Sequence, residues 1–169
     1  TIVGNYILEG VYFFSGFMFF YNLGRNNKMP GSVQEIRYIN RDENTHLRLF
    51  QNIIMELKKE EPHLFTPEKV DVYRAMIKEG CEQEIRWGCY AIGDEVQGLT
   101  KDMVTDYIQY LGNLRCKNLG FDGIFEGHDK EPESMTWVSQ YSNANMIKTD
   151  FFEARSTAYA KSSALLDDL

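Results

Sequence analysis

A glutamate and a histidine three positions apart, Glu43 and His46, could hold one metal ion between them if their segment is helical. Positions that recur every three or four residues in this segment share one helix face. The residues at those positions are Ile36, Ile39, Glu43, His46, Phe50 and Ile53. A carboxylate and an imidazole thus interrupt an apolar stripe, and an unpaired carboxylate is costly to bury. We therefore expect metal ligation here rather than a buried hydrogen-bonded pair.

A third candidate ligand, Glu9, is the one carboxylate in the apolar run 6–23, YILEGVYFFSGFMFFYNL. This run approaches the roughly 20 residues that a membrane span requires. A carboxylate in lipid is costly and rare, and the basic region that opens a signal peptide is absent from the residues before the run. We therefore expect a buried helix of a helical protein and no membrane span. Its Glu9-bearing face broadly contains Ile2, Glu9, Phe13, Phe17 and Phe20.

The three candidate ligands amount to half of a known kind of site. Dinuclear carboxylate centres in ferritin-like bundles take one Glu from each of two helices and Glu-x-x-His from each of the other two. Glu9, Glu43 and His46 match one of each. A second Glu-x-x-His at Glu60–His63 contains Pro62, which breaks helical geometry, so we interpret it as a helix end.

The helices that must position these residues can be placed from their boundary signals. Ser32 and Glu35 form a capping-box pattern, and Thr66 with Pro67 is typical of a helix start. We expect helices over residues 2–23, 32–59, 66–96 and 100–120, followed by an irregular stretch from Phe121. Strand-type alternation is absent, so the fold class is all-α. The expected division is a helical bundle over 1–120 and an extended segment over 121–169.

Composition excludes several functional classes. The 169 residues include 25 Asp or Glu and 18 Lys or Arg, for a net charge of −7, which argues against nucleic-acid binding. Hydrophobic residues make up 43%, too many for a disordered chain. The three cysteines show neither disulfide nor metal spacing. We expect a soluble, acidic, cytoplasmic protein.

Four blocks of sequence, in order, resemble the small radical-generating subunit of class I ribonucleotide reductase. They are ILEGVYFFSGFMFFYNL, IRYINRDENTHL at 36–47, GLTKDMVTDYIQYLGNLR at 98–115 and KTDFFEARSTAYAK at 148–161. The resemblance spans nearly the whole chain and implies the second half of a ferritin-like bundle. It implies that the chain is the C-terminal half of the subunit.

The resemblance also implies roles for individual residues. The matched ligands of a dinuclear metal centre, Fe/Fe with Mn/Fe or Mn/Mn as alternatives, are Glu9, Glu43 and His46. The matched apolar pocket that shields the family's radical contains Phe13, Phe17 and Ile39. Asp42 matches an acid that hydrogen-bonds a metal-ligating histidine on the radical-transfer route. Tyr159 and Glu153 match residues that relay the radical toward the large subunit.

The activity implied is reduction of ribonucleotides to deoxyribonucleotides. The implied partners are the N-terminal half of the small subunit, a second small subunit in a dimer, and the large subunit. The tail SALLDDL at 163–169 mixes apolar and acidic residues, as the family's large-subunit-binding tail does.

Two alternatives remain open at this point. One is a ferritin-like ferroxidase that completes its di-iron site across a homodimer, because three ligands from each of two chains make six. The other is a non-catalytic subunit that keeps the bundle and the tail only to dock partners. Retention of all three ligand residues argues against the second.

Overall fold

Residues 1–142 are described by the computed structural model, and every regular element among them is helical. The elements are α1 (Ile2–Gly10), α2 (Phe14–Arg25), α3 (Pro30–Glu60), the 3-10 turn η1 (Pro62–Phe65), α4 (Pro67–Ile92), α5 (Lys101–Asn118), the 3-10 turn η2 (Glu133–Met135) and α6 (Thr136–Ser142). The expected all-α class is confirmed.

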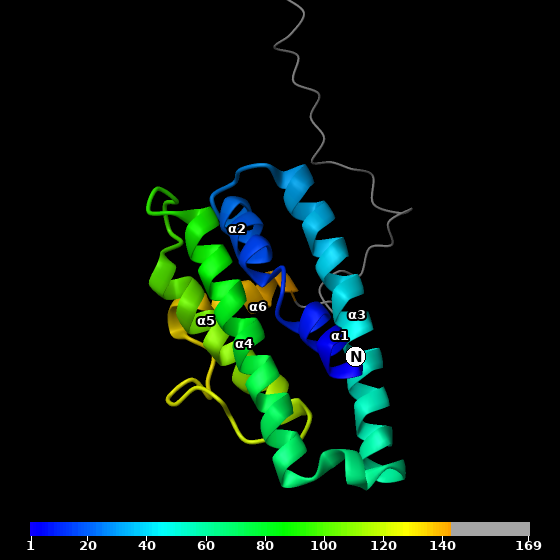
Figure 1. Cartoon of the computed structure of the whole chain (residues 1–169). Coiled ribbons are helices and arrows are strands. Elements are labelled where there is room, and N and C mark those ends of the chain that lie inside the picture. The colour runs from blue at the N-terminus through cyan, green and yellow to red at the C-terminus, as the bar shows by residue number, and fades with distance from the viewer. Residues whose placement is uncertain (143–169) are drawn as a thin grey trace, which may run out of the picture.

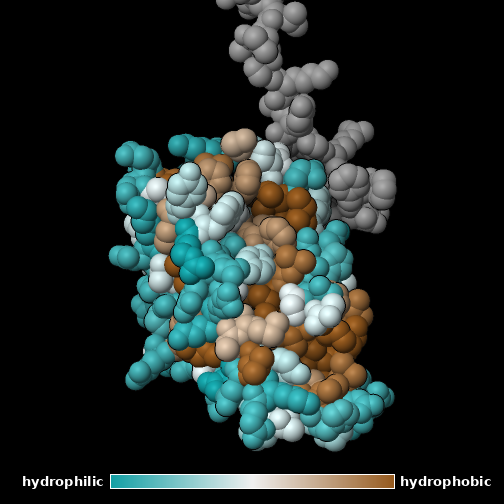
Figure 2. All heavy atoms as spheres, in the orientation of Figure 1, coloured by the Kyte–Doolittle hydropathy of each residue, from teal (hydrophilic) through white to brown (hydrophobic). Residues whose placement is uncertain are grey.

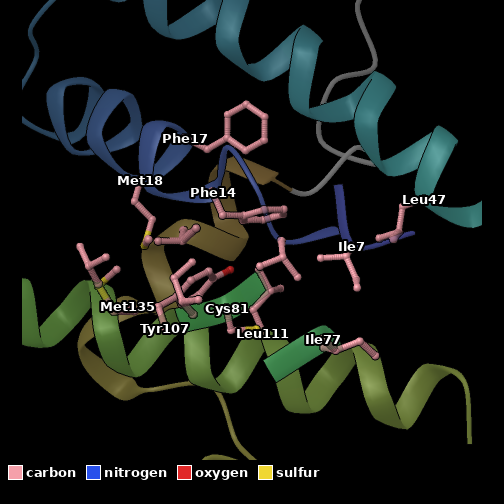
Figure 3. Packing of buried hydrophobic residues seen from close by; sticks show 14 of the residues in the cluster. Ile7, Phe14, Phe17, Met18, Leu47, Ile77, Cys81, Tyr107, Leu111 and Met135 are labelled. Carbon is pink, nitrogen blue, oxygen red and sulfur yellow. The ribbon is translucent and has the colours of Figure 1, made fainter. Parts of the chain in front are cut away.

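The two short helices α1 and α2 lie between the long helix α3 and the pair α4 and α5 (Figure 1). Figure 3 shows Phe14 and Met18 on the side of α2 that faces α4 and α5, and Phe17 on the side toward α3. Met18, Tyr107 and Leu111 are among the side chains that fill the core on the α4–α5 side. The apolar N-terminal run is thus packed between two layers of helix, because hydrophobic residues cover most of its circumference.

Two helix starts behave as their sequence signals predict. The Thr100 hydroxyl accepts a hydrogen bond from the Met103 N–H at 3.2 Å, which satisfies one free donor at the start of α5. Pro67 occupies the first turn of α4, where the N–H that proline lacks has no helical acceptor anyway.

The predicted start of α3 at Ser32 is wrong by one half-turn. The helix begins at Pro30, after Met29 in a left-handed conformation with φ 49°, so Ser32 lies inside the first turn. The capping box is not used, because the proline already starts the helix upstream.

The single helix predicted over 2–23 is also wrong. α1 ends at Gly10 and α2 begins at Phe14, with Phe13 in a left-handed conformation at φ 75°. By length and composition alone, the stretch Ile2–Arg25 has one window apolar enough to cross a membrane (mean hydropathy 1.3), and half of that window is buried inside the structure.

The stretch after Gly120 is more ordered than predicted. Asn113 of α5 anchors it: its Oδ1 accepts from the N–H groups of Ile124 (2.8 Å) and Phe125 (2.9 Å), and its Nδ2 donates to the Phe125 carbonyl (2.7 Å). Side chain to backbone bonds of this kind give no periodic signal in a sequence. The division of the chain at residue 120 stays a prediction.

The short helix α6 was likewise not expected, and it is fastened to α2 and α3. The Tyr141 ring stacks on Tyr21 with centroids 5.2 Å apart. The Asn40 amide donates to the Tyr21 hydroxyl at 2.7 Å and to the Ser142 hydroxyl at 3.3 Å. α6 is therefore held against the middle of α3.

Candidate metal centre

Glu9 of α1 meets Glu43 and His46 of α3 where the two helices pack side by side. One potential ligand atom from each of these residues lies within 4.8 Å of the others. The His46 Nδ1 is 3.0 Å from a Glu43 carboxylate oxygen and 3.4 Å from a Glu9 carboxylate oxygen. Residues 34 positions apart in the sequence thus converge, as the sequence predicts.

The site lies at the edge of the core rather than within it. The side chains of Glu9 and Glu43 are 17% and 23% exposed, whereas that of His46 is 53% exposed. Within residues 1–142 the predicted stripe is covered only in part: Ile36 and Phe50 pack against the core, whereas Ile39 is 47% exposed. The buried residues of α3 recur every seven positions and are Val33, Asn40, Leu47 and Ile54.

The electrostatics of the cluster suit a cation. The hydrogen bond that Glu9 shares with Glu43 raises the pKa of Glu9, and burial adds to the effect, while His46 opposes it. The hydrogen bond to Glu43 raises the pKa of His46. Carboxylate oxygens and an imidazole nitrogen are donors that suit iron and manganese. Two carboxylates held together with an imidazole fit a divalent metal, because the ion's charge offsets their mutual repulsion.

The three residues expected to form an apolar pocket differ in burial. Phe17 is 4% exposed and stacks on Tyr21 with centroids 6.4 Å apart. Phe13 is 49% exposed and Ile39 is 47% exposed. Figure 2 shows hydrophobic surface gathered over α1 and the adjoining part of α3. Within residues 1–142 this face is open, and the role of the three residues in a pocket stays a prediction.

The residues expected to transfer a radical are less fully described. The Asp42 side chain is 60% exposed and pairs with Arg41 at 3.2 Å, on the exposed side of α3. Tyr159 and Glu153 lie outside the described residues, as does the tail at 163–169. The roles of all of them stay predictions.

The second Glu-x-x-His is a helix end, as interpreted from Pro62. α3 ends at Glu60, and His63 lies in η1, where its Nδ1 is 3.3 Å from a Glu61 carboxylate oxygen. Both of these side chains are more than half exposed.

Two buried charged residues beside the site were not predicted. Arg115 is 6% exposed and Glu84 is 3% exposed, and both contact the backbone between α1 and α2. The one sequence signal for Glu84 is its place between Gly80 and Gly88, one helical turn from each. Arg115 gives no comparable signal.

Known families account for this arrangement. The family model "Ribonucleotide reductase, small chain" matches residues 1–132. The chain is 74% identical over 167 residues to a ribonucleoside-diphosphate reductase subunit beta of Treponema pallidum (strain Nichols), covering 99% of this chain and 48% of the relative. It is 41% identical over 164 residues to a subunit of the same name from Halalkalibacterium halodurans, covering 97% of this chain and 47% of the relative.

Solved structures agree. The ribonucleotide reductase R2 subunit from Clostridium botulinum superposes with a TM-score of 0.79 at 47% identity, covering 83% of this chain and 44% of that chain. A structure described as a putative class I ribonucleotide reductase from Bacillus halodurans gives 0.77 at 38% identity, covering 83% and 49%. The expected ferritin-like fold of the small-subunit type is therefore confirmed. The chain spans about half the length of the curated relatives it matches. It belongs to the ribonucleotide reductase small-chain family.

Proposed function

We propose that the chain is part of the small subunit of a ribonucleoside-diphosphate reductase and supplies half of the ligands of its dinuclear metal centre. The observation that carries this proposal is the convergence of Glu9, Glu43 and His46, whose ligand atoms lie within 4.8 Å of one another. The whole assembly reduces ribonucleotides to deoxyribonucleotides in the cytoplasm.

Each residue of the cluster has a distinct task. Glu9 and Glu43 supply oxygen ligands from different helices. His46 supplies its Nδ1, which already faces both carboxylates. When bound, the dinuclear centre supplies the oxidising equivalent that the small subunit stores as a radical. The proposed metal pair is Fe/Fe. Mn/Fe and Mn/Mn are the alternatives, because the same carboxylate and imidazole ligands suit manganese as well as iron.

The open side of the cluster is the place for the N-terminal half of the subunit. Leu8, next to Glu9, is 42% exposed, and Ile39, one turn before Glu43, is 47% exposed. Exposed apolar side chains around a half-set of ligands favour a helical partner that covers them and brings the other ligands. The remaining length of the relatives is sufficient for such a segment.

The later steps involve residues that match the family pattern. Asp42, one position before Glu43, hydrogen-bonds a metal-ligating histidine and lies on the radical-transfer route. Glu153 and Tyr159 continue this relay, Phe13, Phe17 and Ile39 enclose the radical, and residues 163–169 dock on the large subunit. A second small subunit completes a dimer. The ferroxidase and docking-only alternatives are less well supported, because the similar curated proteins are named as reductase subunits.

Metal content of the full-length subunit tests the proposal. Glu43→Ala and His46→Ala are each expected to abolish metal at one of the two positions, because each removes a ligand. Elemental analysis measures the metal per subunit, and Glu56→Ala, an exposed substitution on the same helix, is the control. Near-full occupancy in both ligand variants would contradict the proposal.

A further inference from the structure

The break between α1 and α2 lies immediately beside the ligand Glu9. α1 ends at Gly10, one residue after Glu9, and the chain passes through Phe13 at φ 75° before α2 begins. A left-handed conformation is unfavourable for a bulky residue such as phenylalanine and persists only where surrounding contacts hold it. The contacts that hold this break therefore bear on where Glu9 lies.

On the α1 side of the break, the contact comes from Arg115 of α5. Its Nε donates a hydrogen bond of 2.8 Å to the Gly10 carbonyl, which the end of α1 leaves without a helical donor. The guanidinium also lies over the Phe14 ring, 5.6 Å from its centroid. Arg115 forms no ion pair with a carboxylate within residues 1–142. Burial lowers the pKa of Arg115.

On the α2 side, the contact comes from Glu84 of α4. The Ser15 N–H, a free donor in the first turn of α2, donates to a Glu84 carboxylate oxygen at 2.9 Å. The residue at the N-cap, Phe13, has no side-chain acceptor, so Glu84 takes the place of an N-cap side chain from another helix. A cation at a helix C-terminus and an anion at an N-terminus are each the charge that the helix dipole favours.

Glycines bring these charged groups close to the break. A Cβ at Gly10 would lie 2.7 Å from Leu47 and 3.0 Å from the Arg115 Nε. On α4, a Cβ at Gly80 would lie 2.6 Å from Ile7, and one at Gly88 would lie 2.7 Å from the Ser15 Cβ. The glycines on α4 stand one turn before and one turn after Glu84. Gly80, Glu84 and Gly88 therefore form one face of α4, on which the two sides of the break pack closely; we call this face the seat of the break.

We propose that Arg115 and Glu84 are positioning residues of the metal centre, which clamp the two sides of the α1–α2 break and thereby set Glu9 against Glu43 and His46. This inference rests on the proposed function. Gly10 transmits the effect, because its carbonyl accepts from Arg115 and its α-carbon leaves no room for a Cβ against Leu47, the residue next to His46. If the break closed into a continuous helix, Glu9 could not keep its place on α3 while α2 kept its place on α4.

Mn²⁺ binding to the metal-free full-length subunit tests the clamp, with free Mn²⁺ followed by electron paramagnetic resonance. Glu84→Leu and Arg115→Met are each expected to weaken Mn²⁺ binding by about 10-fold or more, the range found when groups that orient metal ligands are removed. The signal of bound Mn²⁺ is expected to change in shape. The matched control is Asn113→Ala, which removes a buried polar side chain of α5 that holds residues 124–125 and not the break.

The control separates positioning from general loss of stability. If Asn113→Ala and Glu84→Leu lower the melting temperature equally and also weaken Mn²⁺ binding equally, the loss of binding follows stability alone, and the clamp is overturned. If Glu43→Ala loses Mn²⁺ while Glu84→Leu and Arg115→Met bind as the natural protein does, the clamp alone fails. If Glu43→Ala also binds Mn²⁺ normally, the proposed function fails first.

Glu84→Gln provides a test should the leucine variant not fold. The amide oxygen can still accept from Ser15, but a bond to a neutral acceptor is about half as strong as one to a carboxylate, so we expect about two- to threefold weaker Mn²⁺ binding. Hydrogen exchange at the Ser15 amide of the metal-free protein is expected to accelerate in parallel. Faster exchange with unchanged Mn²⁺ affinity would overturn the proposal.

Discussion

The two sides of α1 differ in how fully their polar groups are satisfied. On the α4–α5 side, the buried charges of Glu84 and Arg115 each bind a specific backbone group. On the α3 side, two carboxylates and a half-exposed imidazole crowd together beside exposed apolar residues. The two buried charges of the first side, the complete side, have partners within residues 1–142. The second side, the unfinished side, has the candidate ligands and the exposed apolar residues of the proposed half-site. The complete side thus contacts the backbone at Gly10, the residue after Glu9.

The largest expected effect on stability comes from opening the complete side. Met18 is fully buried, so Met18→Ala should destabilise the subunit by about 2–5 kcal/mol through lost burial and a cavity. Thermal unfolding of the metal-free subunit measures this. Leu49→Ala, at a 56% exposed position of α3, is the control and should cost much less. Equal losses would contradict the difference between the two sides.

Metal should stabilise the subunit only through the unfinished side. Because a ligand that binds the folded state adds stability by mass action, Mn²⁺ at about 100 times its dissociation constant should add about 2.7 kcal/mol. The shift in melting temperature on Mn²⁺ addition measures this, and removal of the metal by a chelator should reverse it. The shift should fall in His46→Ala; an undiminished shift would mean that Mn²⁺ acts elsewhere.

A methyl group added to α4 at the seat of the break should also destabilise the subunit. Gly88→Ala places a Cβ 2.7 Å from the Ser15 Cβ, and overpacking of this kind costs about 1–3 kcal/mol. Gly31→Ala is the control, since a Cβ there meets nothing within 4 Å. Denaturant unfolding of both variants gives the comparison. A stabilised Gly88→Ala would show that the α2–α4 contact is looser than described.

The smallest effect on stability is expected at Asp42, on the exposed side of α3. Its pair with Arg41 is solvated, so Asp42→Asn should change stability by less than about 1 kcal/mol. If Asp42 lies on the radical-transfer route, turnover of the assembled reductase should nevertheless fall sharply with the metal content unchanged. Normal turnover would remove Asp42 from that route.

Much of this arrangement could be predicted from local sequence. Thr100 marks a helix start through a hydrogen bond within one turn, and Pro67 marks another because the N–H that it lacks is not needed there. Glu9, Glu43 and His46 are identified by spacing and apolar flanks. The break at Phe13 could not be predicted, because it is held by Arg115, a residue 105 positions from Gly10. The part of the α3 stripe that this chain covers could not be predicted, because apolar residues lie on more than one face of α3 and periodicity does not tell which face the chain itself covers.

α3 carries two candidate ligands and also holds α6 in place. Asn40, one turn before Glu43, binds Ser142 and Tyr21, so α6 is held to the same helix that carries two of the candidate ligands. If α3 slides along or rotates about its axis, the hydrogen bonds of Asn40 and the candidate ligands move together. A force applied to α6 would reach the candidate metal centre across a single turn of α3.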